Sequence, residues 1–450
     1  MKQDSVDRRP LVEAALVIHP VRARAGAILR TPEQRLEEAV GLTEALDLKI
    51  SEAMLIPLRT PAPATLFGKG KVEEIAAACR GYEVDVVVVD DQLTPVQQRN
   101  LEKAWEVKVI DRTGLILEIF ARRARTGEGK LQVELARLAY ERSRLVRTWT
   151  HLERQRGGFG VMGGPGETQI ETDRRLLAEK IGKLKKELQE VRRTRGLGRS
   201  ARKRAPHPVL ALVGYTNAGK STLFNRLTGA KVEARDMLFA TLDPTLREVK
   251  LPGGRPAILS DTVGFISDLP HELVEAFRAT LEEVREADVI LHVRDISSEE
   301  TDAEAADVKT VLAEIGVDIN AGSEDADQPR RAVVEVWNKV DLLPDEARET
   351  LLARVARPAG STAAPVVAVS AVTGEGIEHL QALLAELVDP GAALDLRFSA
   401  ADGEALAWLY RHGRVTDRAE ENDGGVRVSV KLDAQALGRF ERLFPEVAAG

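Results

Sequence analysis

The chain has 450 residues, of which 44% are hydrophobic and 30% charged, and its formal net charge is −7. This balance is ordinary for about three globular domains, and the single cysteine, Cys79, excludes an internal disulfide framework and fits a reducing compartment. With no apolar run near the roughly 18 residues of a transmembrane helix and no signal-type segment at the N-terminus, the sequence predicts a cytoplasmic protein without stable membrane insertion.

Residues 1–126 are predicted to form an α/β N-terminal domain. Apolar runs such as EAALVIHP (13–20) alternate with helical patterns, and Thr94 is placed to cap the helix that follows it. This alternation favours a parallel sheet covered by helices. The run LFGKGK (66–71) lacks the four-residue gap of a phosphate loop, so we interpret it as a flexible basic loop.

Residues 127–206 predict an antiparallel helical hairpin that ends in a basic linker. Apolar residues recur in each half at spacings of mostly three and four, which is typical of a coiled-coil seam. In the first half they are Leu131, Leu135, Leu138, Leu145, Trp149 and Leu152, with one gap at the charged Arg142. In the second half they are Ile170, Leu177, Ile181, Leu184, Leu188 and Val191.

The same region carries most of the positive charge of the chain. Residues 121–206 hold 23 Lys and Arg against 10 Asp and Glu, a local charge of +13 in a chain whose remainder carries −20. A basic block in an acidic protein is expected of a surface that contacts a nucleic-acid backbone. A solvated helical face with unbalanced charge is the alternative, and the pattern alone leaves both open.

A glycine-rich tip separates the two halves of the hairpin. Residues 157–166 contain six glycines in ten positions, which is more than the roughly two to five residues that reverse a helical hairpin. The tip is either a disordered loop or a probing element flanked by arginines, and we favour the second reading. The flanking residues are Arg154, Arg156, Arg174 and Arg175.

Residues 207–389 again alternate strands and helices. Five nearly continuous apolar runs predict a sheet that is buried on both faces. His271 is interpreted as a surface residue at a helix start and not as a catalytic base. Residues 390–450 read as a small α/β C-terminal domain in which we find no chemistry.

A phosphate loop begins this third segment. The residues match G-x4-G-K-S where a strand ends and a helix starts; they are Gly214, Tyr215, Thr216, Asn217, Ala218, Gly219, Lys220 and Ser221, followed by Thr222. Main-chain N–H groups and the helix N-terminus would surround the phosphates. Lys220 would bridge the β- and γ-phosphates, and Ser221 would bind Mg²⁺.

Three further motifs follow at the ends of predicted strands. The first motif consists of Asp261, Thr262, Val263 and Gly264. Its Asp261 supplies a carboxylate for Mg²⁺, and its Gly264 supplies an N–H for the γ-phosphate. The second motif consists of Asn338, Lys339, Val340 and Asp341. The carboxylate of Asp341 can accept two hydrogen bonds from guanine and none from adenine. Ser370, Ala371 and Val372 can close on the edge of the base. Four motifs in series predict a GTPase that binds GTP and GDP.

A switch segment is expected between the phosphate loop and Asp261. It comprises Phe239, Ala240, Thr241, Leu242 and Asp243, and its Thr241 would complete the Mg²⁺ shell when the γ-phosphate is present. The predicted metal ligands are therefore Ser221, Thr241 and Asp261. The groups expected to act directly in hydrolysis are Lys220, Thr241 and Gly264.

Two residues bear on how hydrolysis is triggered. Phe265 follows Gly264 where many GTPases have a water-orienting glutamine, so intrinsic hydrolysis should be slow without a partner. Asn217 could coordinate a monovalent cation such as K⁺ beside the phosphates, or it could brace the loop by hydrogen bonds. The sequence leaves these two readings at parity.

With these motifs, the chain resembles the HflX family of translation-factor-class GTPases over nearly its full length. The specific matches are the Gly-Lys run at 66–71, the stretch from Gly163 to Asp173, the switch segment with Pro244, and Asp261 to Phe265. The predicted segments together give an α/β protein, with a P-loop GTPase domain that is preceded by an α/β N-terminal domain and an antiparallel helical hairpin and followed by a small α/β C-terminal domain. The resemblance implies binding to the 50S ribosomal subunit and its ribosomal RNA, with the tip reaching toward the peptidyl-transferase region.

The resemblance further implies that GTP drives the separation of stalled or idle ribosomes and that the ribosome stimulates hydrolysis. Two other hypotheses stay open: a GTPase that assembles the large subunit, and a signalling switch that does not act on ribosomes. We expect the protein to be a monomer.

Overall fold

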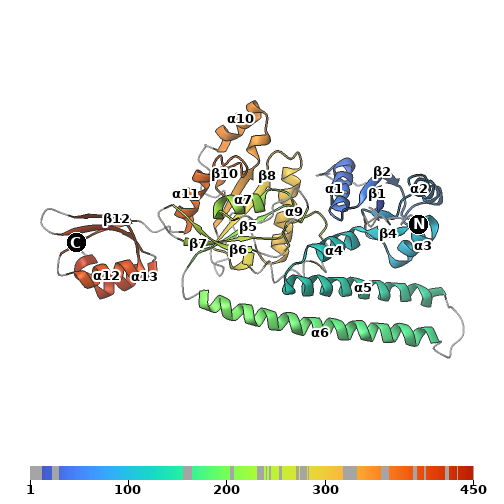
Figure 1. Cartoon of the computed structure of the whole chain (residues 1–450), viewed down its shortest axis with the longest axis horizontal. Helices are drawn as coiled ribbons and strands as arrows, with labels where there is room; N and C mark the ends of the chain where they lie inside the picture. The colour runs from blue at the N-terminus through green and yellow to red at the C-terminus, as the bar shows by residue number, and fades with distance from the viewer. Residues whose placement is uncertain are drawn as a thin grey trace, which may run out of the picture.

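The structure is a computed structural model of the chain (Figure 1). It describes residues 13–22, 30–155, 165–202, 207–230, 238–239, 241–242, 245–252, 256–269, 273, 281, 283–317, 332–355, 364–388, 393–399, 402–420, 425–432 and 434–448. Tip residues 157–164 and the flanking Arg156 lie outside these ranges, as do Ala240, Asp243, Pro244 and His271. The last two residues predicted for the tip, Pro165 and Gly166, begin a helix instead. Among the described residues, no helix combines the length and the apolarity needed to cross a bilayer.

The N-terminal domain is a four-stranded parallel sheet with helices on both faces, in the order β2-β1-β3-β4. Alternate residues of a strand point to opposite faces, so Val17 and Val88 pack against α1 and α4 while Leu16 and Val87 pack against α2 and α3. The elements are β1 (Ala14–Arg22), α1 (Pro32–Glu44), β2 (Lys49–Leu58), α2 (Lys69–Gly81), β3 (Val86–Val89), α3 (Pro95–Trp105), β4 (Lys108–Asp111) and α4 (Arg112–Arg123).

Two helix starts of this domain test local predictions. Thr94 caps α3 as predicted, through a reciprocal capping box with Gln97. The flexible loop predicted at 66–71 is wrong. Leu66 and Phe67 are buried in the core, and Gly68 is the N-cap of α2, so the lysines at 69 and 71 belong to the first turn of a helix.

The hairpin consists of α5 (Gly127–Gln155) and α6 (Pro165–Arg202), which lie side by side in Figure 1. At about 1.5 Å per residue, α6 is about 57 Å long. Of the predicted seam residues, Leu138, Ile181 and Leu188 are buried, whereas Val191 is exposed. The side chains at 145–170 lie outside the description.

Helix α5 is attached to the N-terminal domain through Asp111, the N-cap residue of α4. The Asp111 carboxylate accepts hydrogen bonds from Gly114 N at 2.8 Å, Tyr140 Oη at 2.7 Å and Arg144 Nη1 at 3.1 Å. Tyr140 and Arg144 belong to α5, so one buried carboxylate both caps a helix and fixes the hairpin. Arg144 is therefore not part of the solvent-exposed basic face.

The third segment is a six-stranded sheet in the order β10-β9-β8-β5-β7-β6. The five predicted strands are present and parallel; β6 is a sixth, antiparallel edge strand that its polar sequence TLREVK did not reveal. The described elements are β5 (Val209–Gly214), α7 (Lys220–Thr228), β6 (Thr245–Lys250), β7 (Pro256–Asp261), β8 (Val289–Asp295), α9 (Thr301–Glu314), β9 (Ala332–Asn338), η1 (Val340–Leu342), α10 (Asp345–Val355), β10 (Val366–Ala368) and α11 (Ile377–Val388).

The C-terminal domain is a three-stranded antiparallel sheet, β11-β13-β12, covered by helices on one face. Its elements are β11 (Ala393–Phe398), α12 (Gly403–His412), β12 (Arg414–Glu420), β13 (Val426–Lys431), α13 (Ala434–Leu443) and α14 (Pro445–Ala448). The small α/β domain that the sequence predicts at 390–450 is therefore present.

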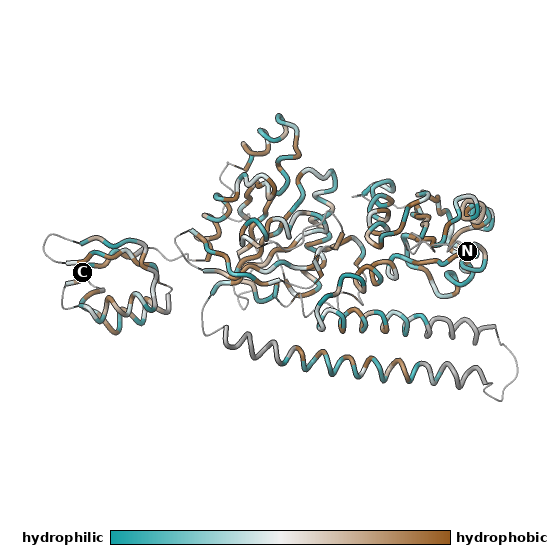
Figure 2. The backbone as a smooth tube through the Cα atoms, in the orientation of Figure 1, coloured by the Kyte–Doolittle hydropathy of each residue, from teal (hydrophilic) through white to brown (hydrophobic). Residues whose placement is uncertain are grey.

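The N-terminal domain packs directly against the third segment, and the C-terminal domain lies at the far end of the molecule (Figure 1). One buried apolar cluster runs across the contact, where the Phe120 ring of α4 meets the Phe239 ring edge to face at 4.6 Å. Figure 2 shows the hydrophobic strands at the centre of the sheet around β5. The predicted α/β architecture with a P-loop domain is confirmed.

We predict that Asp111→Ala lowers the unfolding free energy of the N-terminal domain by about 3 kcal/mol, because it uncaps α4 and leaves Arg144 without its buried counter-charge. Hydrogen exchange of the β3 and β4 amides measures this opening free energy. Glu73→Ala, at an exposed ion pair with Lys69, is the control and should cost less than about 0.5 kcal/mol. An equal loss in both variants would contradict the role of Asp111.

Candidate functional site

The phosphate loop connects the end of β5 to the start of α7 at the carboxyl edge of the six-stranded sheet. Gly219 has φ +90°, and a Cβ there would collide with the amide of Asn338. A Cβ at Gly214 would collide with the main-chain oxygen of Val293 on β8. Both glycines of the motif are thus required by close backbone approach. Asn217 has φ +60° and is exposed at the mouth of the loop.

Lys220 closes the loop on itself. The Nζ atom donates to the main-chain oxygens of Gly214 at 3.0 Å and Tyr215 at 2.6 Å. An ammonium has three N–H donors, so one is left for a ligand. Burial lowers the pKa of Lys220 to about 8, although Asp261 and Glu304 act in the opposite direction.

The three predicted metal ligands converge beside this lysine. Ser221 Oγ donates to Asp261 Oδ2 at 2.7 Å, and Thr241 Oγ1 lies 3.1 Å from the same oxygen and 2.8 Å from Ser221 Oγ. Burial raises the pKa of Asp261, which these hydrogen bonds and Lys220 partly oppose. Asp261 Oδ1 is buried without a hydrogen-bond partner among the described residues. An oxygen-only donor set with an unsatisfied carboxylate oxygen fits Mg²⁺.

The loop after Asp261 lies directly on the phosphate loop. Phe265 N donates to Gly214 O at 3.1 Å, and Phe265 O accepts from Thr216 N at 2.7 Å. A Cβ at Gly264 would stand 3.2 Å from Lys220 Nζ, so the main chain of Gly264 borders the lysine head. The Phe265 ring is buried in the apolar cluster, which means that it cannot orient a water molecule.

The second half of the site lies at the ends of β9 and β10. Asn338 connects it to the phosphate loop, because Nδ2 donates to Ala218 O at 2.9 Å and Oδ1 accepts from Ala371 N at 3.0 Å. Lys339 Nζ pairs with Asp295 at 2.7 Å. Asp341 is half-buried in η1. The remaining predicted residues differ in exposure: Val340, Ser370 and Ala371 are buried, and Val372 is exposed.

The other described side chains of the switch segment do not point toward Ser221 and Asp261 as Thr241 does. Phe239 and Leu242 are buried in the apolar cluster, so only their main chains can contact a nucleotide. Thr262 Oγ1 donates to Leu212 O at 2.6 Å, and Val263 is buried. Thr222, in the first turn of α7, is half-buried. The structure thus brings Lys220, Ser221, Thr241, Asp261 and Gly264 together.

Two kinds of contact had no signal in the sequence. Arg226 in α7 donates to the main-chain oxygens of Ala371, at 3.1 Å, and Val372, and so holds the loop that follows β10. The Tyr215 hydroxyl donates to the carboxylate of Glu38 in the N-terminal domain. Neither Arg226 nor Glu38 belongs to a motif, since each acts through a partner more than a hundred residues away.

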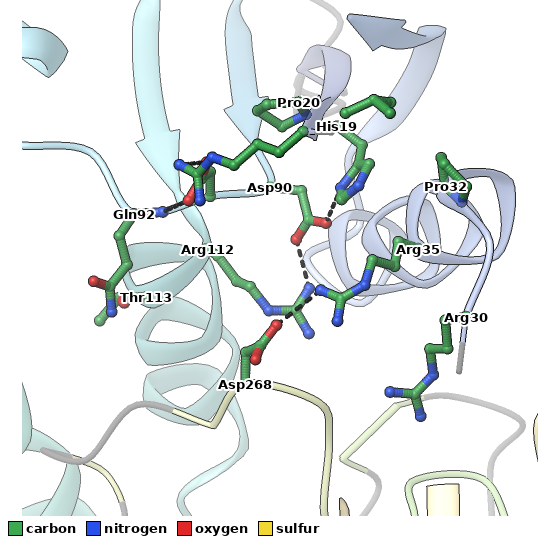
Figure 3. A pocket seen from close by; sticks show the side chains of 13 residues that line it. His19, Pro20, Arg30, Pro32, Arg35, Asp90, Gln92, Arg112, Thr113 and Asp268 are labelled. Atoms are coloured by element: carbon green, nitrogen blue, oxygen red, sulfur yellow. Dashed lines mark hydrogen bonds and ion pairs between the residues drawn. The ribbon is translucent and has the colours of Figure 1, made fainter. Parts of the chain in front are cut away.

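A hollow of about 300 Å³ lies at the carboxyl ends of β1, β3 and β4 (Figure 3). Its four arginines each bind a carboxylate: Arg22 with Asp91, Arg30 with Glu300 and Asp307, Arg35 with Asp268, and Arg112 with Asp90 and Glu38. This hollow is an ion-pair network, and the paired arginines do not indicate a second nucleotide site.

Comparisons with known families match the chain in four consecutive parts. Their profiles are described as GTP-binding GTPase N-terminal (33–121), GTP-binding GTPase middle region (123–202), 50S ribosome-binding GTPase (209–324) and HflX C-terminal domain (355–448).

Individual relatives cover nearly the whole chain. A GTPase HflX of Magnetococcus marinus is 51% identical over 413 residues, covering 91% of this chain and 90% of its own. A GTPase HflX of Escherichia coli is 44% identical over 398 residues, covering 88% and 89%. A solved GTP-binding protein of Sulfolobus solfataricus in complex with GDP is 24% identical, with a TM-score of 0.43 over 84% of this chain and 98% of its own.

We predict that GDP affinity falls as pH rises through 8. Phosphate binding needs the charged lysine, and above its pKa of about 8 the free protein must take up a proton to bind. Affinity at pH 9 should be about eightfold lower than at pH 7.5, measured by titration calorimetry. In Lys220→Arg, whose guanidinium stays charged, this pH dependence should disappear. A wild-type affinity that is flat over this range would contradict the prediction.

Proposed function

The chain belongs to the HflX family of GTPases and hydrolyses GTP to GDP and phosphate, and we propose that it binds the large ribosomal subunit and uses GTP to split stalled or idle ribosomes. The observation that carries this proposal is the basic hairpin. A second consideration is that the family profile matching 209–324 is described as a 50S ribosome-binding GTPase. We place this activity in the cytoplasm.

The exposed face of α6 has the charge that a phosphate backbone requires. Its described basic side chains are exposed: Arg174, Arg175, Lys180, Lys183, Lys185, Lys186 and Arg193. Only two of them pair with a carboxylate on the same helix, Arg175 with Glu179 and Arg193 with Glu190. Lysines that neutralise the phosphates of ribosomal RNA release the counterions held there. The affinity of this face for RNA should therefore fall as the salt concentration rises.

The hairpin is also long enough to reach into a large partner. The tip sequence precedes the N-terminal end of α6. The length of the helix would therefore place the tip about 57 Å from the other end of α6, at Arg202. We propose that the tip enters the peptidyl-transferase region of the 50S subunit. We also propose residues 126, 206 and 389 as the boundaries of the four units of the chain.

At the nucleotide site, each residue has a proposed task. Lys220 and the main-chain N–H of Gly264 hold the γ-phosphate, and Asp341 accepts hydrogen bonds from guanine. Ser221, Thr241 and Asp261 would hold Mg²⁺, which neutralises charge on the β- and γ-phosphates when bound. Asn217, exposed at the mouth of the loop, is the residue that we propose for K⁺.

The buried Phe265 suggests how the ribosome would control hydrolysis. A phenyl ring has no donor or acceptor that could orient water, and this one lies in the core, so a partner must supply such a group or rearrange the site. Slow turnover by the protein alone and fast turnover on the 50S subunit would follow. The protein, which we propose to be a monomer, would then hydrolyse GTP only when it is bound to its target.

We predict that deleting residues 157–166 leaves GTP affinity within about twofold of wild type but abolishes the separation of 70S ribosomes. Gradient sedimentation of purified ribosomes with protein and GTP measures the separation. A second variant that reverses the charge of Arg174 and Arg175 while keeping the tip should weaken binding and make its salt dependence shallower, because fewer phosphates are neutralised.

Other outcomes would select another function. Splitting that is unchanged by the tip deletion would overturn the proposed role of the hairpin. Binding to immature 50S particles without dissociation of mature ribosomes would instead support an assembly factor. GTP turnover that does not respond to 50S particles would support a signalling switch that does not act on ribosomes.

A further inference from the structure

A buried polar cluster joins the N-terminal domain to the nucleotide site. Its members are Glu38 of α1, Arg112 of α4, Tyr215 of the phosphate loop and Ser267; we call it the α1–switch cluster. The Glu38 carboxylate accepts hydrogen bonds from Ser267 Oγ at 2.6 Å, from Arg112 Nη2 at 2.8 Å and from the Tyr215 hydroxyl.

The other contacts of the cluster close a network. Arg112 Nη2 donates to the main-chain oxygen and to Oγ of Ser267, each at 2.8 Å. Ser267 N donates to Tyr215 Oη at 2.8 Å. Burial opposes the positive charge of Arg112, but Asp90 and Glu38 outweigh it and raise its pKa further above the ordinary value. The arginine therefore stays charged and depends on both carboxylates.

The cluster is connected to the part of the site that meets the γ-phosphate. Ser267 lies three residues after Gly264, and between them Phe265 is bonded in both directions to the phosphate loop. Any displacement of Gly264 must therefore strain the contacts of Ser267 or move it. Arg35 of α1 extends the same contact by pairing with Asp268 at 2.8 Å (Figure 3).

The switch segment is held by the same face of the N-terminal domain. The Phe239 ring packs on Phe120 of α4, and Leu238 lies 3.4 Å from the position that a Cβ would take on Gly41 of α1. Two residues later, Thr241 contacts Ser221 and Asp261. Helices α1 and α4 thus contact both loops that close on a γ-phosphate.

We propose that Glu38 is a positioning residue that holds the loop after Asp261 closed on the phosphate loop, so that the N-terminal domain contributes to the preference for GTP over GDP. GDP lacks the phosphate that this loop meets, so its binding depends less on the closed arrangement. The coupling is reciprocal: a partner that favours this contact between the domains raises GTP affinity by the same factor. The inference rests on nucleotide binding and not on the ribosome.

The test compares nucleotide affinities of the full-length protein. In Glu38→Gln, which keeps the side-chain size but removes the charge, affinity for guanosine 5′-[β,γ-imido]triphosphate should fall about tenfold, the effect of one charge-assisted hydrogen bond. GDP affinity should stay within about twofold. Glu37→Gln, at the adjacent exposed carboxylate of α1, is the matched control and should change neither affinity.

Ser267→Ala provides an independent variant, since it removes the Oγ contact with Glu38 and little volume. It should show the same selective loss, and the double variant should lose less than the sum of the two single losses, because both residues act within one cluster. An unchanged ratio of triphosphate to GDP affinity in both single variants would overturn the proposal, as would an equal loss for both nucleotides. Failure of the wild-type protein to bind either nucleotide would overturn the site itself and this inference with it.

Discussion

The buried ammonium of Lys220 is the interaction on which the rest of the structure depends. Two of its N–H groups hold the carbonyls of Gly214 and Tyr215, which fixes the curvature of the phosphate loop. The loop can be this tight only because Gly214 and Gly219 leave room for the neighbouring β8 and Asn338. The loop after Asp261 and the ends of β9 and β10 are then attached to this loop, through Phe265 and Asn338 respectively.

The start of α4 gives this arrangement a wider consequence. Asp111, its N-cap, fixes the hairpin through Tyr140 and Arg144, and the next residue, Arg112, engages Ser267 beside the nucleotide site. Two consecutive residues thus attach one helix to the proposed ribosome-binding element and to the loop after Asp261. If the hairpin docks on the ribosome as proposed, this short connection would couple docking to the nucleotide state.

The sequence predicted the parts that depend on local spacing. The phosphate loop, Asp261 and Asn338 were found because each follows a continuous apolar run, and parallel strands bring their carboxyl ends to one edge. The polar edge strand β6 was missed because no apolar pattern marks it. The run at 66–71 was misread because its lysines suggested exposure, whereas burial of Leu66 and Phe67 is a tertiary effect.

The contacts between domains could not be predicted in this way. Glu38 and Ser267 are 229 residues apart, and nothing in either local pattern indicates the other. Without an apparent partner, Glu38 reads as one more acidic residue on an amphipathic helix. Such contacts follow only from how the N-terminal domain packs on the sheet, and that packing is decided by the whole apolar cluster around Phe120 and Phe239.

The measurement that tests the central claim most directly is a calorimetric titration of the full chain with GDP and ADP in the presence of Mg²⁺, repeated on Asp341→Asn with xanthosine diphosphate. The account predicts that the wild type binds GDP on the order of 10⁴-fold more tightly than ADP and that the variant prefers the xanthine nucleotide, whose ring offers an acceptor where guanine offers a donor. Equal binding of GDP and ADP by the wild type, or unchanged guanine preference in the variant, would contradict it.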